Sequence, residues 1–187
     1  MTHIASLGSG IFSYLDIYDG STNPSSENAA GYADLFVTGN SSDIQRMPSV
    51  REFPSIGTPA NIVNVPVYGQ NTSSQIQGQA DAPSLEFTFN YIPTNHFALD
   101  ALRKSGTNLV FRVRLSNTED GGVQASPPEP STSPAEYEDI YFQGTIASFE
   151  IVPALTDATQ ANIALTIDGD FEGPYSYVDV AGTATYQ

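Results

Sequence analysis

The fold is decided by residues 85–115, LEFTFNYIPTNHFALDALRKSGTNLVFRVRL. Apolar and polar residues alternate over 85–91, which is the period-two pattern of a strand with one apolar face. Pro93 ends this strand, and the same alternation returns over 109–115. The stretch therefore predicts a strand, a short helix and a second strand.

The segment between these strands has the composition of a short amphipathic helix. Thr94 or Asn95 is able to cap its start, and Gly106 suits the left-handed position after its end. Arg103 and Lys104 lie in the last turn, where the helix dipole favours positive charge. The apolar stripe consists of Phe97, Ala98, Leu99, Ala101 and Leu102. Because about three turns of helix are marginally stable alone, we expect this helix to pack on the strands.

Before this unit, strands are predicted over 11–18 and 34–38, and a polar turn over 40–48. Residues 20–31 are rich in Ser, Asn, Pro and Gly, which predicts a loop or mobile arm. The wider arm and loop region covers 40–83. Its extended segments run over 51–56 and 61–68 and contain Pro54, Pro59 and Pro66. Proline cannot donate to a β-ladder, so we expect edge strands or a projecting hairpin arm.

After this unit, residues 116–136 form a Pro-rich surface loop of low hydrophobicity. A long strand is predicted over 140–155, and its apolar parity switches near Ala147 or Ser148, which indicates a bulge. A turn over 156–160 leads into a last clear strand over 163–167. The length of 187 residues favours a single domain, 1–187.

The charge of the chain is its most unusual global property. Asp and Glu number 21 against six Lys and Arg, so the net charge is −15. Such a surface repels nucleic-acid phosphates at long range and disfavours ordinary nucleic-acid binding. The chain has no cysteine, and no apolar run reaches the roughly 20 residues that span a bilayer. Residues 1–10 lack a basic and an apolar region, so no signal peptide or membrane association is expected.

Catalytic constellations are weak in this sequence. His3 and His96 are far apart, and His96 is expected to be a satisfied residue at the helix start. Asp168-Gly169-Asp170 favours a turn after a strand over a cation site. The acidic cluster Glu136, Glu138 and Asp139 offers paired carboxylates of the kind that hydrolyse glycosides, but exposed acids are common in so acidic a chain. We therefore expect no enzyme activity, no metal and no cofactor.

Residues 138–144, EDIYFQG, resemble the recognition sequence of a tobacco-etch-type potyviral protease. Such a segment is used in expression fusions, where it marks a scar. Here its apolar residues continue into Ile146. We interpret it as a native strand that matches by chance.

Several pieces of the chain together resemble the tail tube (major tail) proteins of long-tailed bacteriophages. The resemblance runs from Leu85 to Gly173, about half of the chain, and depends on the order of the pieces. They are the strand and helix up to Gly106 with the core Ala98-Leu99-Asp100-Ala101-Leu102, the strand over 109–115, the segment Phe142-Gln143-Gly144-Thr145-Ile146-Ala147-Ser148, and the strand Ile163-Ala164-Leu165-Thr166-Ile167-Asp168-Gly169. The first half departs from the family in detail, and the 116–135 loop is similar to an insertion.

The resemblance implies a mainly β fold. Two antiparallel sheets pack as a sandwich or partly open barrel, with one short flanking helix and extended arms. It also implies a structural virion protein, assembled in the host cytoplasm, whose hexameric rings stack into a hollow tail tube. Tape-measure, terminator and baseplate proteins would be its other partners, and DNA would pass through the lumen without specific binding. A ring that joins strands between subunits removes exposed sheet edges.

Candidate assembly residues follow from the strands and the charge. Arg51 and Phe53 of the edge segment are candidates for contacts between subunits. Arg112 and Arg114, on the polar face of their strand, either meet acids of an adjacent subunit or remain solvated or paired within their own. Candidate acids for a tube lumen are Asp168, Asp170 and Glu172.

Two other function classes compete with a tube subunit. A β-sandwich that binds glycans or decorates a capsid would use the ten Tyr and ten Phe for stacking, but most of these alternate as core residues do. A hydrolase using acidic residues lacks a convergent set. Electron microscopy of the concentrated protein distinguishes rings or tubes from monomers that bind a glycan.

Overall fold

The computed structural model describes residues 13–47, 50–57, 62–66, 68–69, 72–77, 84–116 and 137–177. The strands are β1 (Tyr14–Tyr18), β2 (Ile44–Met47), β3 (Val50–Glu52), β4 (Ile62–Val65), β5 (Ser74–Gln77), β6 (Ser84–Asn90), β7 (Leu109–Ser116), β8 (Tyr137–Val152) and β9 (Gln160–Tyr177). The helices are α1 (Ala29–Ala33), the 3₁₀ helix η1 (Thr38–Asp43), α2 (Pro93–His96) and α3 (Ala98–Ser105). The predicted loop 116–136 lies outside the described residues except for Ser116.

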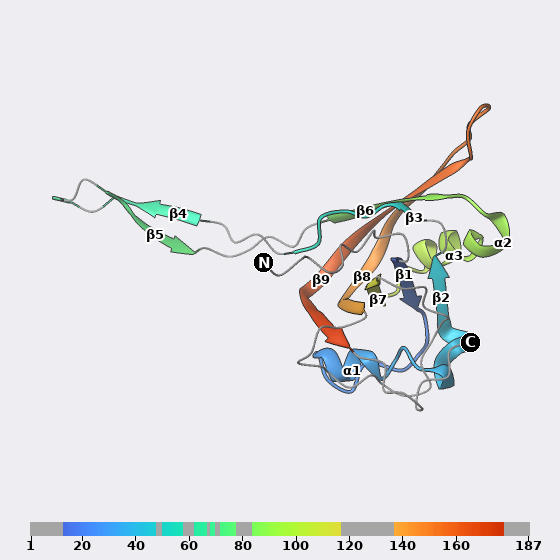
Figure 1. Ribbon diagram of the computed structural model, residues 1–187, viewed down its shortest axis with the longest axis horizontal. Coiled ribbons are helices and arrows are strands. Elements are labelled where there is room, and N and C mark those ends of the chain that lie inside the picture. Colours follow the sequence, from blue (N-terminus) through green and yellow to red (C-terminus); the bar gives the residue numbers. More distant parts are fainter. Residues whose placement is uncertain are drawn as a thin grey trace, which may run out of the picture.

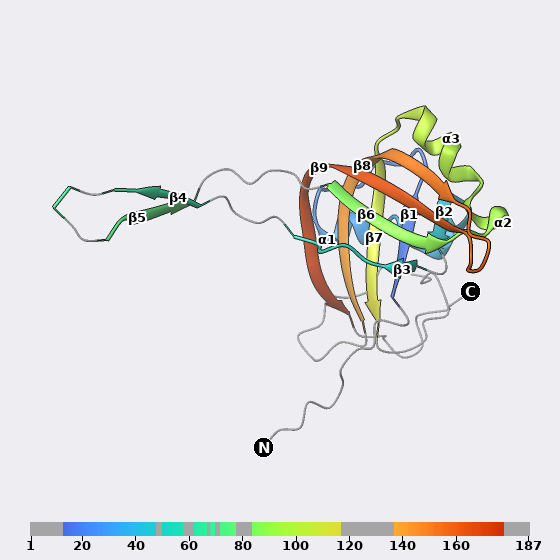
Figure 2. The same ribbon diagram turned by 90° about the horizontal axis from the view of Figure 1, so that it is seen from above.

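Within this described part, seven strands form one antiparallel sheet in the order β2-β1-β7-β8-β9-β6-β3. Its centre is the long β8–β9 hairpin, which belongs to both layers of the fold (Figures 1 and 2). Residues 137–144 of β8 pair with 109–116 of β7, whereas 160–166 of β9 pair with 84–90 of β6. The two predicted layers are therefore halves of one continuous sheet that folds over. The mainly β, antiparallel prediction is confirmed.

The main core lies between these two halves and takes residues from both, together with Leu99 of α3. Leu85, Phe87 and Phe89 are buried at alternate positions of β6, as their spacing predicts. Leu115 differs from the prediction because it lies near the end of β7, beyond the core, and is 40% exposed. The core comprises Leu15, Ile17, Met47, Leu85, Phe87, Phe89, Leu99, Leu109, Phe111, Val113, Phe142, Ile146, Ala161, Ile163 and Leu165.

A second apolar cluster covers the other face of β1, β7 and β8. Its cover is α1 and the turn that follows, a region that the sequence did not identify as helical. Asn28 caps α1 by accepting a hydrogen bond from the Gly31 N–H at 3.1 Å. The cluster comprises Tyr18, Tyr32, Ala33, Leu35, Phe36, Val110 and Tyr141. The sheet is thus buried on both sides near α1.

The β8 strand bends where the sequence predicts a bulge. Its register with β9 shifts between Ile146 and Ser148. Close by, Gly144 lies so near to β9 that a Cβ atom there would stand 2.1 Å from the carbonyl oxygen of Thr166. A glycine is therefore needed at this position for the backbones to approach.

The helical part of the central unit differs in detail from its prediction. The helix begins at Pro93 and is interrupted at Phe97, and Ile92, not Thr94 or Asn95, occupies the N-cap without a side-chain bond. Phe97 is 72% exposed, so it is not part of the buried stripe. The end is as predicted, because Gly106 adopts a left-handed conformation with φ 62°.

Three further predictions about local structure are wrong. Residues 34–38 are not a strand, because the turn after α1 and the start of η1 occupy this region. The predicted turn over 40–48 contains η1 and then β2, which completes the sheet edge beside β1. The 168–170 segment does not end its strand, because β9 continues to Tyr177 with Gly169 at φ 95° inside it.

The predicted projecting arm is present as the separate hairpin β4–β5, which stands well away from the body of the molecule (Figures 1 and 2). Val63 lies opposite Ile76, and Val65 opposite Ser74. Its described residues are all exposed. A two-stranded hairpin alone in water is marginally stable.

Candidate assembly surfaces

The positive charges of the chain are all neutralised by aspartates of the same chain. The six Lys and Arg residues of the sequence all lie in the described part. Each has an Asp oxygen within 4.0 Å. The pairs are Arg46–Asp16, Arg51–Asp157, Arg103–Asp100, Lys104–Asp100, Arg112–Asp16 and Arg114–Asp139.

Two of these pairs are fully buried on the α1 side of the sheet. Arg112 donates from Nε and Nη2 to Oδ2 of Asp16, and its Nη1 lies 4.0 Å from Asp139. Arg114 donates from Nε to Oδ1 of Asp139 at 2.6 Å. All four side chains are at most 1% exposed. Buried charges of this kind are tolerated only when they are paired and hydrogen-bonded.

Aromatic side chains close this buried ionic cluster. Arg112 lies 4.6 Å above the centre of the Phe36 ring, and the Tyr141 hydroxyl donates to Asp139 at 3.1 Å. Burial and the neighbouring Arg114 lower the pKa of Arg112, but Asp16 and Asp139 outweigh them and the net shift is upward. Burial raises the pKa of the Tyr14 hydroxyl, and the centre of the Tyr14 ring lies 3.6 Å from the Arg46 guanidinium carbon. The cluster is therefore charged and structural.

The structure consequently places Arg112 and Arg114 inside the subunit. Of the two alternatives that the sequence allows, the structure has the two arginines paired with aspartates of their own chain. Asp16 of β1 and Asp139 of β8 reach them because β1 and β8 flank β7. The alternation of β7 predicts that both arginines lie on the face away from the main core. It does not identify their partners, because the strand order that brings Asp16 and Asp139 beside β7 depends on distant residues.

Arg51 and Phe53 lie at the edge of the sheet, on and just after β3. Arg51 is half-exposed, and its Nη1 is 3.6 Å from an oxygen of the exposed Asp157. Phe53 packs edge-to-face on Phe87 with ring centres 5.9 Å apart. Arg51 is therefore accessible to other molecules, whereas Phe53 is partly buried against the main core of its own subunit.

The three acids considered for a lumen gather along the second half of β9. Asp168 and Asp170 are exposed, whereas Glu172 is half-buried and accepts a hydrogen bond from the Tyr175 hydroxyl at 2.5 Å. This bond to Glu172 raises the pKa of Tyr175 to about 12. With Glu27 they line a cavity of about 270 Å³, so four carboxylates meet on this surface.

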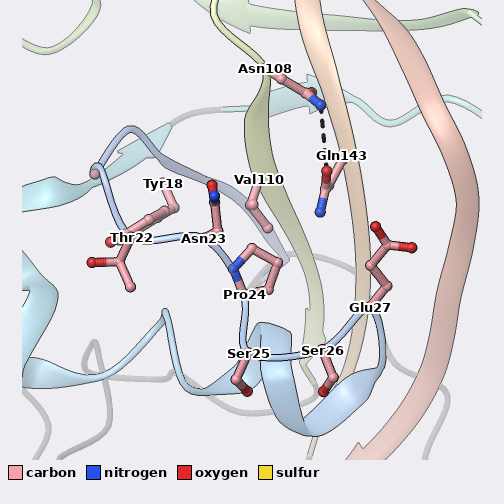
Figure 3. A pocket seen from close by; sticks show the side chains of 11 residues that line it. Tyr18, Thr22, Asn23, Pro24, Ser25, Ser26, Glu27, Asn108, Val110 and Gln143 are labelled. Carbon is pink, nitrogen blue, oxygen red and sulfur yellow. Dashed lines mark hydrogen bonds between the residues drawn. The ribbon is translucent and has the colours of Figure 1, made fainter.

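A second cavity, of about 480 Å³, lies between the 20–27 loop and β7 and β8 (Figure 3). Its wall carries mainly hydroxyl and amide groups, with Glu27 as the single carboxylate among its described residues. Asn108 donates to Gln143 across its rim at 3.4 Å. The hydroxyl of Tyr18 is buried without a hydrogen-bond partner. The described lining is polar and contains no acid–base pair.

His96 is fully buried under Phe89 and beside Tyr91. Its Nδ1 accepts the N–H of Ile92 at 2.9 Å, so it satisfies the helix start as predicted. Burial lowers its pKa, which keeps the ring neutral. Its Nε2 is buried without a partner.

Among the described residues, no three or more His, Cys, Asp or Glu side chains are grouped so as to hold a metal ion. Of the helices described, none has the length and hydropathy that crossing a membrane requires.

Two exposed surfaces without charge lie at opposite ends of the molecule. The first is one face of the arm, formed by Val63, Val65 and Ile76, which we call the arm face. The second is the end of the β8–β9 hairpin with Ile151, Val152 and Leu155, which we call the hairpin tip. The arm projects at one end of the longest axis, and the hairpin tip lies toward the other end (Figures 1 and 2).

Comparison with known proteins identifies the fold. No protein-family model and no curated protein matches this chain. The SPP1 tail tube, solved by solid-state NMR and cryo-electron microscopy, is similar over 91% of this chain and 80% of that chain, with a TM-score of 0.52 and 14% identity. A crystal structure of Hcp protein aligns over 94% of this chain and 97% of that chain, at a TM-score of 0.41 and 15% identity. The tail-tube fold expected from the sequence is thereby confirmed.

Proposed function

We propose that this protein is a structural subunit that assembles into stacked rings and forms the tube of a bacteriophage tail. The observation that carries the proposal is the β4–β5 arm, which makes no strand contact with the large sheet in the described structure. An arm of this kind gains its packing partners from other copies. The likeness of fold to the SPP1 tail tube supports this kind of assembly.

The finer features of the assembly are part of the same proposal. The rings contain six subunits, and the tube belongs to a virion that is built in the host cytoplasm. Tape-measure, terminator and baseplate proteins contact its ends. The protein has no catalytic role and no cofactor.

The proposed lumen is acidic and lets the genome pass without specific binding. Asp168, Asp170 and Glu172 lie together with Glu27 around one cavity, so negative charge is concentrated there. A wall of this charge repels DNA phosphates, and the net charge of −15 acts in the same direction. Arg51 on the edge strand contributes to contacts between subunits, with Phe53 supporting it from the body.

Cryo-electron microscopy of the concentrated full-length protein tests this function. Hollow tubes of stacked sixfold rings, with the β9 acids on the inner wall, are the expected result. A matched variant that lacks the arm, with residues 58–83 replaced by a short Gly-Ser linker, should remain folded and monomeric. Monomers of the unaltered chain at high concentration, or solid particles without a bore, would contradict the proposal.

A further inference from the structure

The arm and the tip are two parts of the described surface that are able to meet without moving charges out of water. Residues 53–80 contain no Lys, Arg, Asp or Glu, although charged residues make up 14% of the chain. Residues 151–156 are also uncharged and lie between Glu150 and Asp157. When two copies that each carry −15 associate, the electrostatic and desolvation cost of the contact is smallest at such surfaces.

The pairing of strands gives the arm one apolar and one mainly polar face. Val63 and Ile76 are directly opposite each other, so their side chains share a face, and Val65 lies on the same face two residues along. Asn64 and Gln75 point to the other face. The exposed fractions are 49% for Val63, 36% for Val65 and 56% for Ile76.

The hairpin tip is exposed because it lies at the end of the large sheet. β6, β8 and β9 end together, because Asn90 and Val152 both lie opposite Gln160, and the turn between Val152 and Gln160 extends beyond this end of the sheet. Ile151 and Val152 are 42% and 46% exposed, and Leu155 at the turn is completely exposed. These side chains have no part in the core of their own subunit.

We infer that the arm face of one copy docks on the hairpin tip of a second copy. This inference rests on the proposed function and adds the surface that receives the arm. The occupant is a second copy because all six cations are already paired within the chain, so that contacts between copies depend mainly on uncharged side chains, with Arg51, whose pair with Asp157 is exposed, as the exception. Surfaces at opposite ends give a head-to-tail contact, which repeats from copy to copy instead of closing as a symmetric dimer.

Cysteine cross-linking tests the contact directly, because the native chain has no cysteine. The double variant Ile76→Cys/Leu155→Cys, oxidised after assembly, should give a ladder of species beyond the dimer on a non-reducing gel. Each single variant should remain monomeric on that gel. An equal mixture of the two singles should give a dimer whose linked peptides contain positions 76 and 155. Ser41→Cys, on the exposed η1, replaces Leu155→Cys as the control and should give no cross-link.

A second measurement uses charge in place of a covalent bond. Leu155→Asp should raise the protein concentration needed for assembly at least about tenfold, because the new charge would be buried without a partner. Ser41→Asp adds the same charge elsewhere and should change this concentration much less. Leu155 is fully exposed, so the fold of the monomer is unaffected.

The outcomes separate this docking from the tube itself. Tubes that form without a link between positions 76 and 155 would overturn the docking and leave the proposed function standing. Dimers of the single variants would also overturn it, since they indicate contacts between like surfaces. Absence of both tubes and cross-links would overturn the docking and the tube together.

Discussion

The guanidinium of Arg114 donates two hydrogen bonds to Asp139, from Nε to Oδ1 at 2.6 Å and from Nη2 to Oδ2 at 2.7 Å. Both side chains are fully buried. Asp139→Asn should therefore lower the free energy of unfolding by about 3–5 kcal/mol, because it leaves buried arginine charge uncompensated. Urea denaturation of the monomer measures this loss.

The exposed pair of Asp100 and Lys104 on α3 is the matched control. Asp100→Asn should have a much smaller effect, since solvent screens that pair. Replacing both buried partners, in Arg114→Met/Asp139→Leu, should cost less than Asp139→Asn alone. Equal losses for the buried and the exposed aspartate would contradict the structural role of the ionic cluster.

Assembly should become stronger as salt is added. Each copy carries −15 and pairs its six cations internally, so the charges of two copies mainly repel. Screening lengths fall from about 10 Å at 0.1 M to about 3 Å at 1 M, which weakens that repulsion. Sedimentation across this range should show a larger assembled fraction at higher salt. An interface made of ion pairs would give the opposite trend.

The stability of the fold should fall as the pH drops below neutrality, and His96 should account for part of this fall. Its pKa is lowered by burial, so between the folded value and the ordinary value of about 6.5 the unfolded chain binds a proton that the folded chain does not. Stability is therefore full above about pH 6.5 and decreases below it, by at most about 1.4 kcal/mol per pH unit.

Thermal unfolding of the protein and of His96→Gln between about pH 7.5 and 5.5 measures this effect. The variant should lose stability less steeply, because glutamine does not titrate. Parallel curves for the two proteins would show that His96 is not the responsible group.

Gly144→Ala should destabilise the subunit by at least about 1–3 kcal/mol, the usual cost of overpacking. The added Cβ would stand 2.1 Å from the carbonyl oxygen of Thr166, which is backbone and unable to turn aside. Gly39→Ala is the control, because nothing lies within 4 Å of its Cβ position. Chemical denaturation of both variants makes the comparison, and similar midpoints would contradict the close approach of β8 and β9.

The folded protein should resist tobacco-etch-type protease, although residues 138–144 match its recognition sequence. This segment lies within β8, hydrogen-bonded to β7 and β9, and Tyr141 and Phe142 are completely buried. Protein unfolded in urea and diluted into protease should be cut after Gln143. Rapid cleavage of the folded form would show that β8 opens easily.

The sequence predicted the elements whose apolar period is strong. β6, β7 and β8 were identified because Phe87, Phe111 and Phe142 belong to clear alternating patterns, and the switch of parity in β8 located its bend. The strand over 163–167 was recognised, but its continuation was not, because Gly169 normally signals a turn. In this case the ladder with β8 overrides the local preference.

The predictions that are wrong concern regions whose structure depends on tertiary contacts. α1 is only five residues long, and its helical state depends on Tyr32 packing on Tyr141 with ring centres 5.9 Å apart. For the same reason, the sequence alone does not decide between the two roles of Arg112 and Arg114. Their partner Asp16 is 96 residues away from Arg112 in sequence, and only the strand order brings the two together. The alternation of apolar and polar residues in a strand indicates which residues face away from the main core. It does not indicate whether another part of the chain covers that second face of the sheet.

The β8–β9 hairpin also has a mechanical consequence. Its two strands are held by β7 on one side and β6 on the other, so force applied to either layer is transmitted through one shared ladder. The body should behave as a stiff unit that deforms very little. A filament of such units would bend at the joints between them, and its elasticity would be set by the arms.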